Sequence, residues 1–446
     1  MSKTRISVAH QEGSQDCPSG EGISRAQFLK GALGAGIVAG GVLVTGLPKL
    51  ASSATSPSRD NTIPRSDTQS PDAISRDPVP EGTVLTAVGD DWYINGTIVN
   101  EGLPFIEGQF LGARMVQALF DVETASGTNP ANYQYPDEVT TWTAPRDPDR
   151  NTAEFIAMIP TYRSYGLNMV TVGMQGGAVA RGSSGWIIGG KGISAWNADG
   201  TMKAGWRTRL IDLLTAADEN GLIVNLQCFY HNRDDVLTDA TAVWAAMYYL
   251  IDVILDPAVN GVKHFQNVLF EVGNELGVSG ASHTILAPDN MGTTITALKS
   301  YVSTNHPGKT LLFSCSLPGG ATHPNDAIGP FDYISIHSNN DTPTDVISSV
   351  NNCRNKSNYS GCPIQITEDN MPFAEAEPTG FPNMVAAIEN RNVGWGFYDQ
   401  PDHIVLSNPG GNYVDGFQSP PVNWSINTFR KQALFDAFAA YAGVTP

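Results

Sequence analysis

Two glutamates stand at the ends of short apolar segments that are typical of buried strands. The first segment, Val268–Val272, is followed by Asn274 and Glu275 after one glycine. The second, Ile364–Thr367, runs directly into Glu368. Cleavage of a glycosidic bond needs such a pair, because one carboxyl group protonates the leaving oxygen while the other attacks the sugar or activates water. A simpler interpretation is that either glutamate only caps the helix that follows it.

The two carboxyl groups can meet only if the fold brings both strand ends to one face. Eight apolar runs have the length of strands. They are Gly108–Arg114, Asn168–Met174, Ile223–Phe229, Val268–Val272, Thr310–Ser314, Tyr333–His337, Ile364–Thr367 and Gly394–Tyr398. The amphipathic helical stretches are Ala153–Tyr165, Gly205–Asn220, Ala242–Leu255, Gly292–Thr304, Thr344–Arg354, Asn383–Arg391 and Ile426–Tyr441.

This alternation predicts the α/β class and, for a chain of this size, a closed (β/α)₈ TIM barrel. An open doubly wound sheet is less favoured, because no GxGxxG follows the first strand. Asp90–Gly102 carries an Asn95-Gly96 turn and predicts a hairpin that caps the barrel floor. The glutamates would then end the fourth and seventh strands, across the mouth from each other, where TIM barrels carry their chemistry. A carboxyl separation of about 5–5.5 Å would imply retention of configuration.

The Asn-Glu pair ending the fourth strand and the glutamate ending the seventh resemble a clan of retaining TIM-barrel glycosidases. This clan includes the cellulase-like glycoside hydrolase family 5, and the resemblance covers nearly all of Val84 to Pro446. It implies that Glu275 is the general acid/base and Glu368 the nucleophile. It also implies that Asn274 hydrogen-bonds the sugar 2-hydroxyl beside the nucleophile.

Other matches extend this resemblance to substrate binding. His231, in LQCFYHN, and His337, in YISIHSN, resemble the histidines of the family after the third and sixth strands. Trp395 or Tyr398, in GWGFYDQ, would supply the aromatic floor expected at the eighth strand. The alternative for each histidine is a purely structural hydrogen bond.

Two positions depart from the family pattern. Asn339 stands where a tyrosine is expected two residues after His337, which puts the orientation of the nucleophile in doubt. The arginine expected on the second strand is absent from NMVTVGMQ, and Arg114 at the end of the first strand is a candidate replacement. The mechanism further leads us to expect a raised pKa for Glu275 in the free protein and an ionised Glu368.

The N-terminal region predicts export. Residues 24–30, SRAQFLK, precede an apolar run at residues 31–47, and small residues at 51–54 offer a cleavage site. The segment resembles a bacterial twin-arginine signal with Ala26 in place of the second arginine. We expect an export signal at 1–54, a disordered linker at 55–82 and a catalytic domain at 83–446. A retained membrane anchor is the alternative.

Composition excludes several classes of partner. The net charge of -18 disfavours nucleic acid. No HxH, HExxH or CxxC occurs, so we expect neither a metal nor another cofactor. Cys353 and Cys362 are free thiols or, in an oxidising compartment, a disulfide.

The sequence therefore predicts an exported glycoside hydrolase, in the periplasm or outside the cell. Its substrate would be an oligo- or polysaccharide, with a β-linked glycan favoured, and it would not stay associated with the membrane. The alternative is a catalytically inactive barrel that binds carbohydrate. A metal-dependent hydrolase ranks third.

Overall fold

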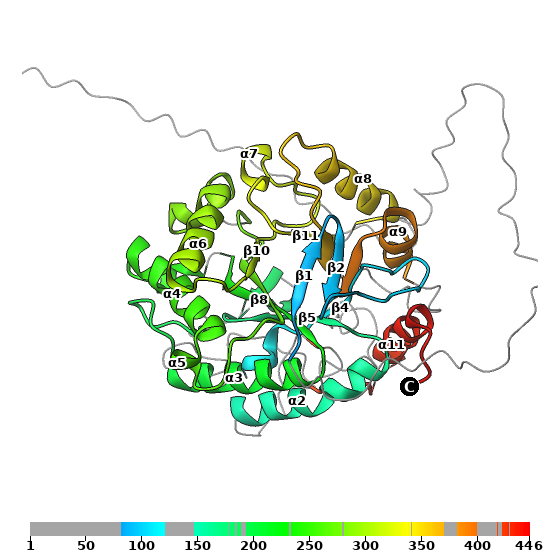
Figure 1. Ribbon diagram of the computed structural model, residues 1–446, viewed down its shortest axis with the longest axis horizontal. Helices are drawn as coiled ribbons and strands as arrows, with labels where there is room; N and C mark the ends of the chain where they lie inside the picture. The colour runs from blue at the N-terminus through cyan, green and yellow to red at the C-terminus, as the bar shows by residue number, and fades with distance from the viewer. Residues whose placement is uncertain are drawn as a thin grey trace, which may run out of the picture. The chain divides into compact units, whose positions relative to one another are not determined.

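The computed structural model describes residues 82–446 except 121–146, 177, 183–184, 189–192, 232, 279–280, 340, 370–380, 399–416, 418–421 and 428 (Figure 1). The expected export signal and linker lie outside the described residues. Within the described part of the chain, no helix combines the length and the apolar character needed to cross a membrane.

Eight parallel strands form the central sheet, and each corresponds to a predicted strand. They are β4 (Leu111–Arg114), β5 (Met169–Gly173), β8 (Ile223–Tyr230), β9 (Val268–Asn274), β10 (Leu312–Ser314), β11 (Ile334–His337), β12 (Ile364–Glu368) and β13 (Gly394–Phe397). The first and last strands pair, with Trp395 opposite Leu111. At the seam between β10 and β11, the backbone N–H of Asp332 donates to the carbonyl of Phe313 at 2.9 Å. The sheet is thus the predicted (β/α)₈ barrel.

The helices surround this barrel (Figure 1). They are α2 (Pro148–Ser164), α3 (Ala204–Glu219), α4 (Ala240–Leu255), α5 (Pro257–Asn260), α6 (Met291–Asn305), α7 (Asn325–Ile328), α8 (Pro343–Arg354), α9 (Pro382–Arg391) and α11 (Phe429–Ala442). Helix α2 begins five residues before its predicted start at Ala153, because Asp147 caps it by accepting the N–H of Arg150 and Pro148 fits its first turn. Between β10 and β11 the helical element is the single turn of α7, for which no helix was predicted.

The predicted hairpin closes the barrel floor. Strands β1 (Leu85–Val88), β2 (Asp91–Ile94) and β3 (Thr97–Ile98) form an antiparallel sheet. Asn95 and Gly96 have φ of 52° and 79°, the left-handed conformation that a tight type I′ turn requires. Trp92 stacks on Phe110 with ring centroids 5.0 Å apart and meets the edge of Tyr333 at 5.8 Å. This plug buries the apolar residues near the starts of the barrel strands.

A small insertion follows β5, where β6 (Ala178–Gly182) and β7 (Gly185–Ile188) pair antiparallel. Three one-turn 3₁₀ segments, η1 (Val116–Leu119), η4 (Asp234–Val236) and η5 (Thr284–Leu286), lie in loops after barrel strands, and η6 (Pro288–Asn290) leads into α6.

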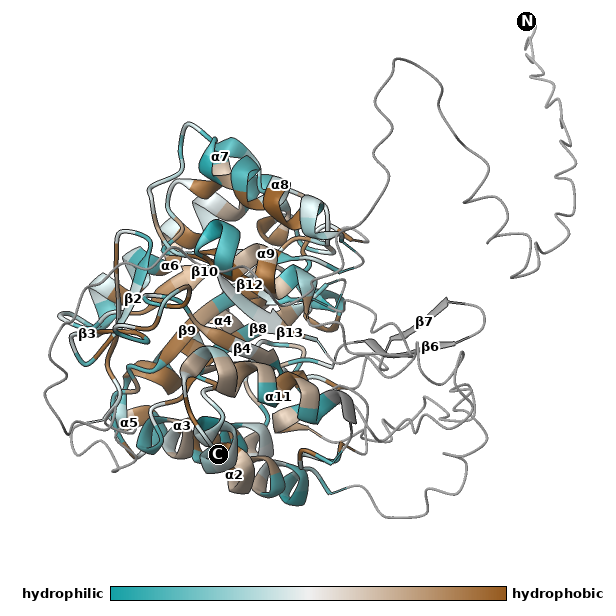
Figure 2. Ribbon diagram, turned by 90° about the vertical axis from the view of Figure 1, so that its right-hand side faces the viewer, coloured by the Kyte–Doolittle hydropathy of each residue, from teal (hydrophilic) through white to brown (hydrophobic). Residues whose placement is uncertain are grey.

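Figure 2 shows hydrophobic stretches in β9 and α4 and hydrophilic ones on α7. The barrel wall therefore packs apolar residues outward against the helices.

A layer of polar side chains lies inside the barrel, between the apolar floor and the mouth. Glu271 on β9 is fully buried, and its carboxylate accepts hydrogen bonds from Asn225 at 2.7 Å and Gln227 at 3.1 Å. Below it, the Tyr333 hydroxyl donates to Asn225 at 2.7 Å. Because side chains alternate along a strand, the Glu271 that interrupts the apolar run VLFEV faces this interior while its neighbours face the helices. The polar layer Asn225, Gln227 and Glu271 supports the mouth from beneath.

Candidate active site

The two glutamates predicted from the sequence lie together at the C-terminal mouth of the barrel. Glu275 directly follows β9, and Glu368 is the last residue of β12. One carboxylate oxygen of each and one nitrogen of His337 lie within 4.8 Å of one another. That spacing fits a retaining pair of carboxyl groups, about 5–5.5 Å apart, and is shorter than the roughly 6.5–9.5 Å of an inverting pair.

Arg114 and Asn339 hold Glu368 from two sides. Arg114, the last residue of β4, places Nε 2.5 Å from Oε2 of Glu368 in a buried ion pair. Asn339 donates its side-chain N–H to Oε1 at 2.6 Å. Burial would lower the pKa of Arg114, but Glu368 above all raises it, so the guanidinium keeps its charge. Arg114, the candidate replacement for the missing arginine, and Asn339, which stands in place of the expected tyrosine, thus both contact Glu368.

The Asn274 side chain is oriented by two donors, one on β4 and one on β8. Its side-chain oxygen accepts from Nη2 of Arg114 at 2.8 Å and from Nε2 of Gln227 at 3.0 Å. These contacts fix which end of the amide is the oxygen. The Nδ2 group is buried and has no hydrogen-bond partner among the described residues. The amide nitrogen of Asn274 is therefore a donor whose bonding capacity is unused within the described part of the chain.

Glu275 lies between two imidazoles. Oε1 is 3.0 Å from Nδ1 of His337, and Oε2 is 3.6 Å from Nδ1 of His231. Burial would raise the pKa of Glu275, but the hydrogen bond and charge of His337, with His231 and Arg114, lower it below its ordinary value. The expectation of a raised pKa in the free protein was therefore wrong. It considered burial and repulsion between carboxylates but not the cationic neighbours.

The two histidines differ in charge. Burial lowers the pKa of His231 to about 4, so its ring is neutral at pH 7. Burial also lowers the pKa of His337, but Glu368 and Glu275 outweigh it and raise the value above 6.5. Nδ1 of His337 lies 3.0 Å from Glu275 and 3.4 Å from Glu368, so both carboxylates favour the protonated form of the ring. A proton on this nitrogen would be one hydrogen bond away from Glu275.

Of the two aromatic candidates, only Tyr398 lies at the mouth. The Arg114 guanidinium sits 5.1 Å from the centre of the Tyr398 ring. Trp395 is fully buried, packs against Phe381 and Phe438 with centroids 5.7 and 6.3 Å away, and donates to Asp369. The expectation that Trp395 forms part of the sugar-binding floor was wrong, because alternation along β13 turns its side chain outward to α11.

The site contains residues that the sequence analysis missed. Ser316, two residues beyond β10, donates to Glu271 at 2.5 Å and accepts the backbone N–H of Glu275 at 3.1 Å. Gln227 contacts both Glu271 and Asn274. The available signal was the interruption of apolar strands by Gln227 and Glu271, whereas Ser316 stands in a serine-rich stretch, FSCSL, with no distinguishing pattern.

The carboxylate–imidazole trio of Glu275, His337 and Glu368 offers the donor types that a divalent cation uses. Its electrostatics oppose that use, since Arg114 already pairs with Glu368 and the raised pKa of His337 favours a protonated ring. A second cation would have to displace one of these charges. The arrangement is suited to proton transfer and nucleophilic attack rather than to metal binding.

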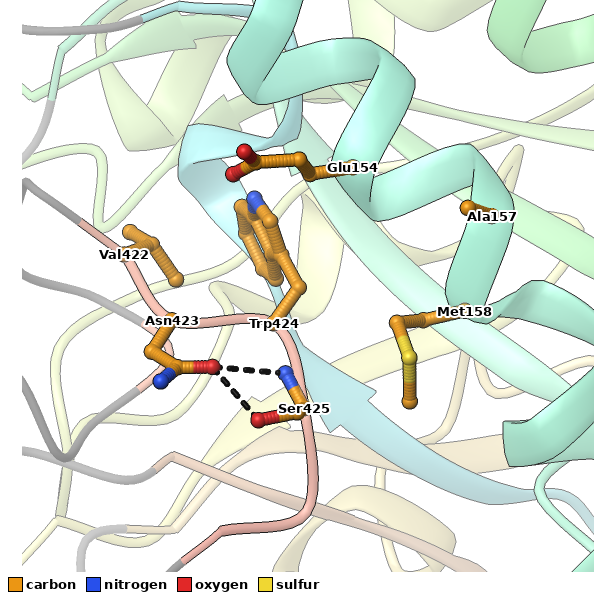
Figure 3. Close-up of a pocket in the computed structure, with 7 residues that line it drawn as sticks. All are labelled: Glu154, Ala157, Met158, Val422, Asn423, Trp424 and Ser425. Atoms are coloured by element: carbon orange, nitrogen blue, oxygen red, sulfur yellow. Dashed lines mark hydrogen bonds between the residues drawn. The ribbon is translucent and has the colours of Figure 1, made fainter.

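A surface pocket of about 540 Å³ lies elsewhere, between α2 and residues 422–425. Figure 3 shows Trp424 beneath Glu154, with Asn423 accepting hydrogen bonds from Ser425. None of the mouth residues lines this pocket. It is therefore not part of the carboxylate site.

The backbone of Glu275 is strained, with φ of 49° in the left-handed region that disfavours residues with a Cβ. We predict that Glu275→Gly is about 1 kcal/mol more stable than Glu275→Ala, because glycine relieves this strain. Urea unfolding midpoints would measure the difference. Glu154 in α2 is the control, since there glycine should be about 1 kcal/mol less stable than alanine. The same order at both positions would contradict strain at Glu275.

No protein-family model and no curated protein matches the chain. Among solved structures, an endo-1,4-β-mannanase from Rhizomucor miehei is 10% identical, with a TM-score of 0.48, over 81% of this chain and 99% of the other. A GH5-4 broad-specificity endoglucanase from Clostridium longisporum is 13% identical, with a TM-score of 0.46, over 78% and 98%. A family 5 mannosidase from Rhizomucor miehei is 13% identical, with a TM-score of 0.43, over 80% and 97%. These likenesses are remote, and the (β/α)₈ barrel is established by the strand pairing of the chain itself.

Proposed function

We propose that this protein is an exported retaining glycoside hydrolase that acts on an oligo- or polysaccharide, with a β-linked glycan as the favoured substrate. The observation that carries the proposal is the pair of carboxylates, Glu275 and Glu368. They lie at the C-terminal ends of two different barrel strands, with an oxygen of one within 4.8 Å of an oxygen of the other. Their surroundings differ, as two different roles require. Glu368 has an arginine and an amide as partners, while Glu275 has two histidines.

In the first step, a carboxylate oxygen of Glu368 attacks the anomeric carbon. Arg114 and Asn339 orient the carboxylate for this attack. Glu275 gives a proton to the leaving oxygen as the glycosidic bond breaks, which produces a glycosyl-enzyme. The released sugar or alcohol leaves with that proton.

The proton comes from the shared cluster. In the free protein Glu275 is ionised and the proton resides on Nδ1 of His337, 3.0 Å from Oε1 of Glu275. When a substrate excludes water and places an ether oxygen beside Glu275, transfer from His337 leaves a neutral imidazole and a neutral acid. Exclusion of water favours this transfer, because burial disfavours the charged forms and the transfer replaces two charged groups by two neutral ones.

In the second step, Glu275 takes a proton from water, and the resulting hydroxide attacks the anomeric carbon. The bond to Glu368 breaks, and the sugar leaves with its original configuration. Asn274 would donate its free Nδ2 group to the sugar 2-hydroxyl, and Tyr398 would contact the ring. His231, next to Glu275, would bind the substrate as a neutral imidazole.

The inactive-barrel alternative rested on the missing arginine and tyrosine. Arg114 and Asn339 supply contacts to Glu368, which favours the enzyme. A screen of the purified domain, residues 83–446, on aryl glycosides and polysaccharides tests the proposal. Hydrolysis with retained configuration supports it, whereas binding of a glycan without hydrolysis supports the inactive barrel.

Export is part of the proposal and rests on the N-terminal sequence. We predict that the mature protein begins between Ala54 and Gly82, after cleavage near the small residues at 51–54. N-terminal sequencing of the exported fraction of the native host measures this. Protein that still begins at Met1 outside the cytoplasm would show that the leader is retained as an anchor.

A further inference from the structure

We infer that Ser316, held in place by Glu271, is a positioning residue that keeps Glu275 in its strained backbone conformation and thereby aims its carboxylate at His337 and the leaving oxygen. The inference rests on the proposed function for its catalytic consequence. Its structural part stands independently, on contacts among buried residues of β9, β10 and the turns that follow them. Neither Ser316 nor Glu271 touches the reacting atoms.

Ser316 clamps the turn after β9 through three hydrogen bonds. Its backbone N–H donates to the carbonyl of Gly273 at 3.2 Å, and its carbonyl accepts the N–H of Leu276 at 3.0 Å. Its hydroxyl oxygen accepts the N–H of Glu275 at 3.1 Å. The two backbone contacts would form with any residue, but the third needs an oxygen on the side chain. Of these three contacts, only the hydrogen bond to the N–H of Glu275 therefore depends on which residue stands at position 316.

Glu271 fixes the direction of that hydroxyl. Oε1 of Glu271 accepts the Ser316 hydroxyl proton at 2.5 Å, which leaves the serine oxygen free to act as an acceptor. The same carboxylate is held by Asn225 and Gln227 and is completely buried. The hydroxyl also lies 3.5 Å from the carbonyl oxygen of Gly273, and the much shorter contact to Glu271 sets its direction. The chain of contacts runs from the polar layer of the barrel through Ser316 to the backbone of Glu275.

The clamp opposes a conformational preference. A left-handed φ of 49° is unfavourable for glutamate, so the turn relaxes unless its surroundings hold it. Tight packing limits the ways in which it can relax, because Leu276 lies against the α-carbon of Gly273. Without the Ser316 oxygen, the N–H of Glu275 also loses its hydrogen-bond partner. Rotation of this peptide would move the Glu275 carboxylate away from His337.

Loss of the Ser316 hydroxyl should impair protonation of the leaving oxygen by Glu275 and should spare nucleophilic attack by Glu368. Glu368 is held by Arg114 on β4 and by Asn339 in the turn after β11, so nucleophilic attack does not depend on Ser316. Protonation of the leaving oxygen does, because it depends on where the Glu275 carboxylate lies. Without the Ser316 hydroxyl, kcat should therefore fall strongly for substrates with poor leaving groups and only slightly for those with an activated aryl leaving group.

The test compares Ser316→Ala with Ser316→Thr, which keeps the hydroxyl, and with Ser314→Ala. Ser314 is an equally buried serine whose hydroxyl, among the residues that the structure describes, donates to the carbonyl of Cys315 at 3.4 Å and to no other group. For Ser316→Ala we expect kcat for an unactivated glycoside to fall about 10²-fold, as misplacement by about 1 Å can produce. On a dinitrophenyl glycoside the first step, followed as a burst, should be little changed. Ser316→Thr should restore activity, and Ser314→Ala should resemble the wild type.

A crystal structure of Ser316→Ala supplies a readout that does not need activity. We expect φ of residue 275 to become negative and the distance from Oε1 of Glu275 to Nδ1 of His337 to exceed 3.0 Å. Unchanged geometry, or equal losses on both kinds of substrate, would overturn the inference. If the wild type hydrolyses no glycoside, the proposed function fails, and the crystal structure still decides whether Ser316 positions Glu275.

Discussion

Replacing Glu368 by alanine should abolish hydrolysis of every glycoside that the wild-type protein cleaves. No glycosyl-enzyme can form without this carboxylate, so even a good leaving group gives no escape. The expected loss in kcat is on the order of 10⁶-fold, by comparison with removal of the nucleophile from other covalent enzymes. The variant should still fold, although Arg114 loses its partner and is left as an unpaired buried charge.

Azide or formate should restore part of this activity on an activated aryl glycoside. A small anion can occupy the space vacated by the carboxylate and attack from the same side, so a single displacement gives an inverted product. Nuclear magnetic resonance of the product at early times reports the configuration. Glu154→Ala, a change at a partly exposed glutamate in α2, is the matched control and should hydrolyse like the wild type. Activity of Glu368→Ala near the wild-type level would remove Glu368 from the role of nucleophile.

Much of the fold was predictable because its signals are local. Each barrel strand is a short apolar run, and each connecting helix has its own periodic pattern, so alternation alone indicated the barrel. The position of a residue at the end of its strand is equally local. Asn274, Glu275 and Glu368 could therefore be placed at the mouth before any contact was known. The Asn95-Gly96 turn specified the hairpin by the same kind of reasoning.

The remaining features depend on which face a side chain occupies and on what lies across the barrel. Trp395 and Tyr398 belong to one peptide, yet the pleat turns one to the helices and the other to Arg114. The resemblance could name Arg114 as a candidate replacement for the missing arginine, but only the closed barrel brings β4 close enough to β12 for Arg114 to contact Glu368. Ser316 carries no pattern at all, because its role arises from contact with the strand beside it.

The charge on Glu275 shows the same limit more sharply. Burial and a neighbouring carboxylate both suggest a raised pKa, and both are readable from the expected site. The opposite direction results from His337 and His231, which come from two other strands and lie on either side of the carboxylate. Protonation states in such a cluster belong to the group as a whole rather than to one residue.

Replacing Glu275 by alanine should make the rate of hydrolysis depend strongly on the leaving group of the substrate. Alkyl glycosides and polysaccharides need a proton on the departing oxygen, so their kcat/KM should fall about 10²–10⁴-fold. A dinitrophenyl glycoside needs almost none, so its first step should proceed and the glycosyl-enzyme should accumulate, since no base activates water. The burst of dinitrophenol followed by slow turnover measures both effects in one experiment.

Azide distinguishes this variant from Glu368→Ala. It needs no base, so it should attack the accumulated glycosyl-enzyme and yield a glycosyl azide of retained configuration, opposite to the product expected without Glu368.

The pH dependence of the wild type follows from the proton that Glu275 gives to the leaving oxygen. In the wild type, kcat/KM on an unactivated substrate should fall as the pH rises through the raised pKa of His337, because the protonated form is the active one. On the dinitrophenyl glycoside, which needs almost no protonation, both the wild type and Glu275→Ala should lack this basic limb. Exchange of the two azide configurations between the variants would reverse the assignment, because the carboxylate that is needed to retain configuration is the one that bonds to the sugar.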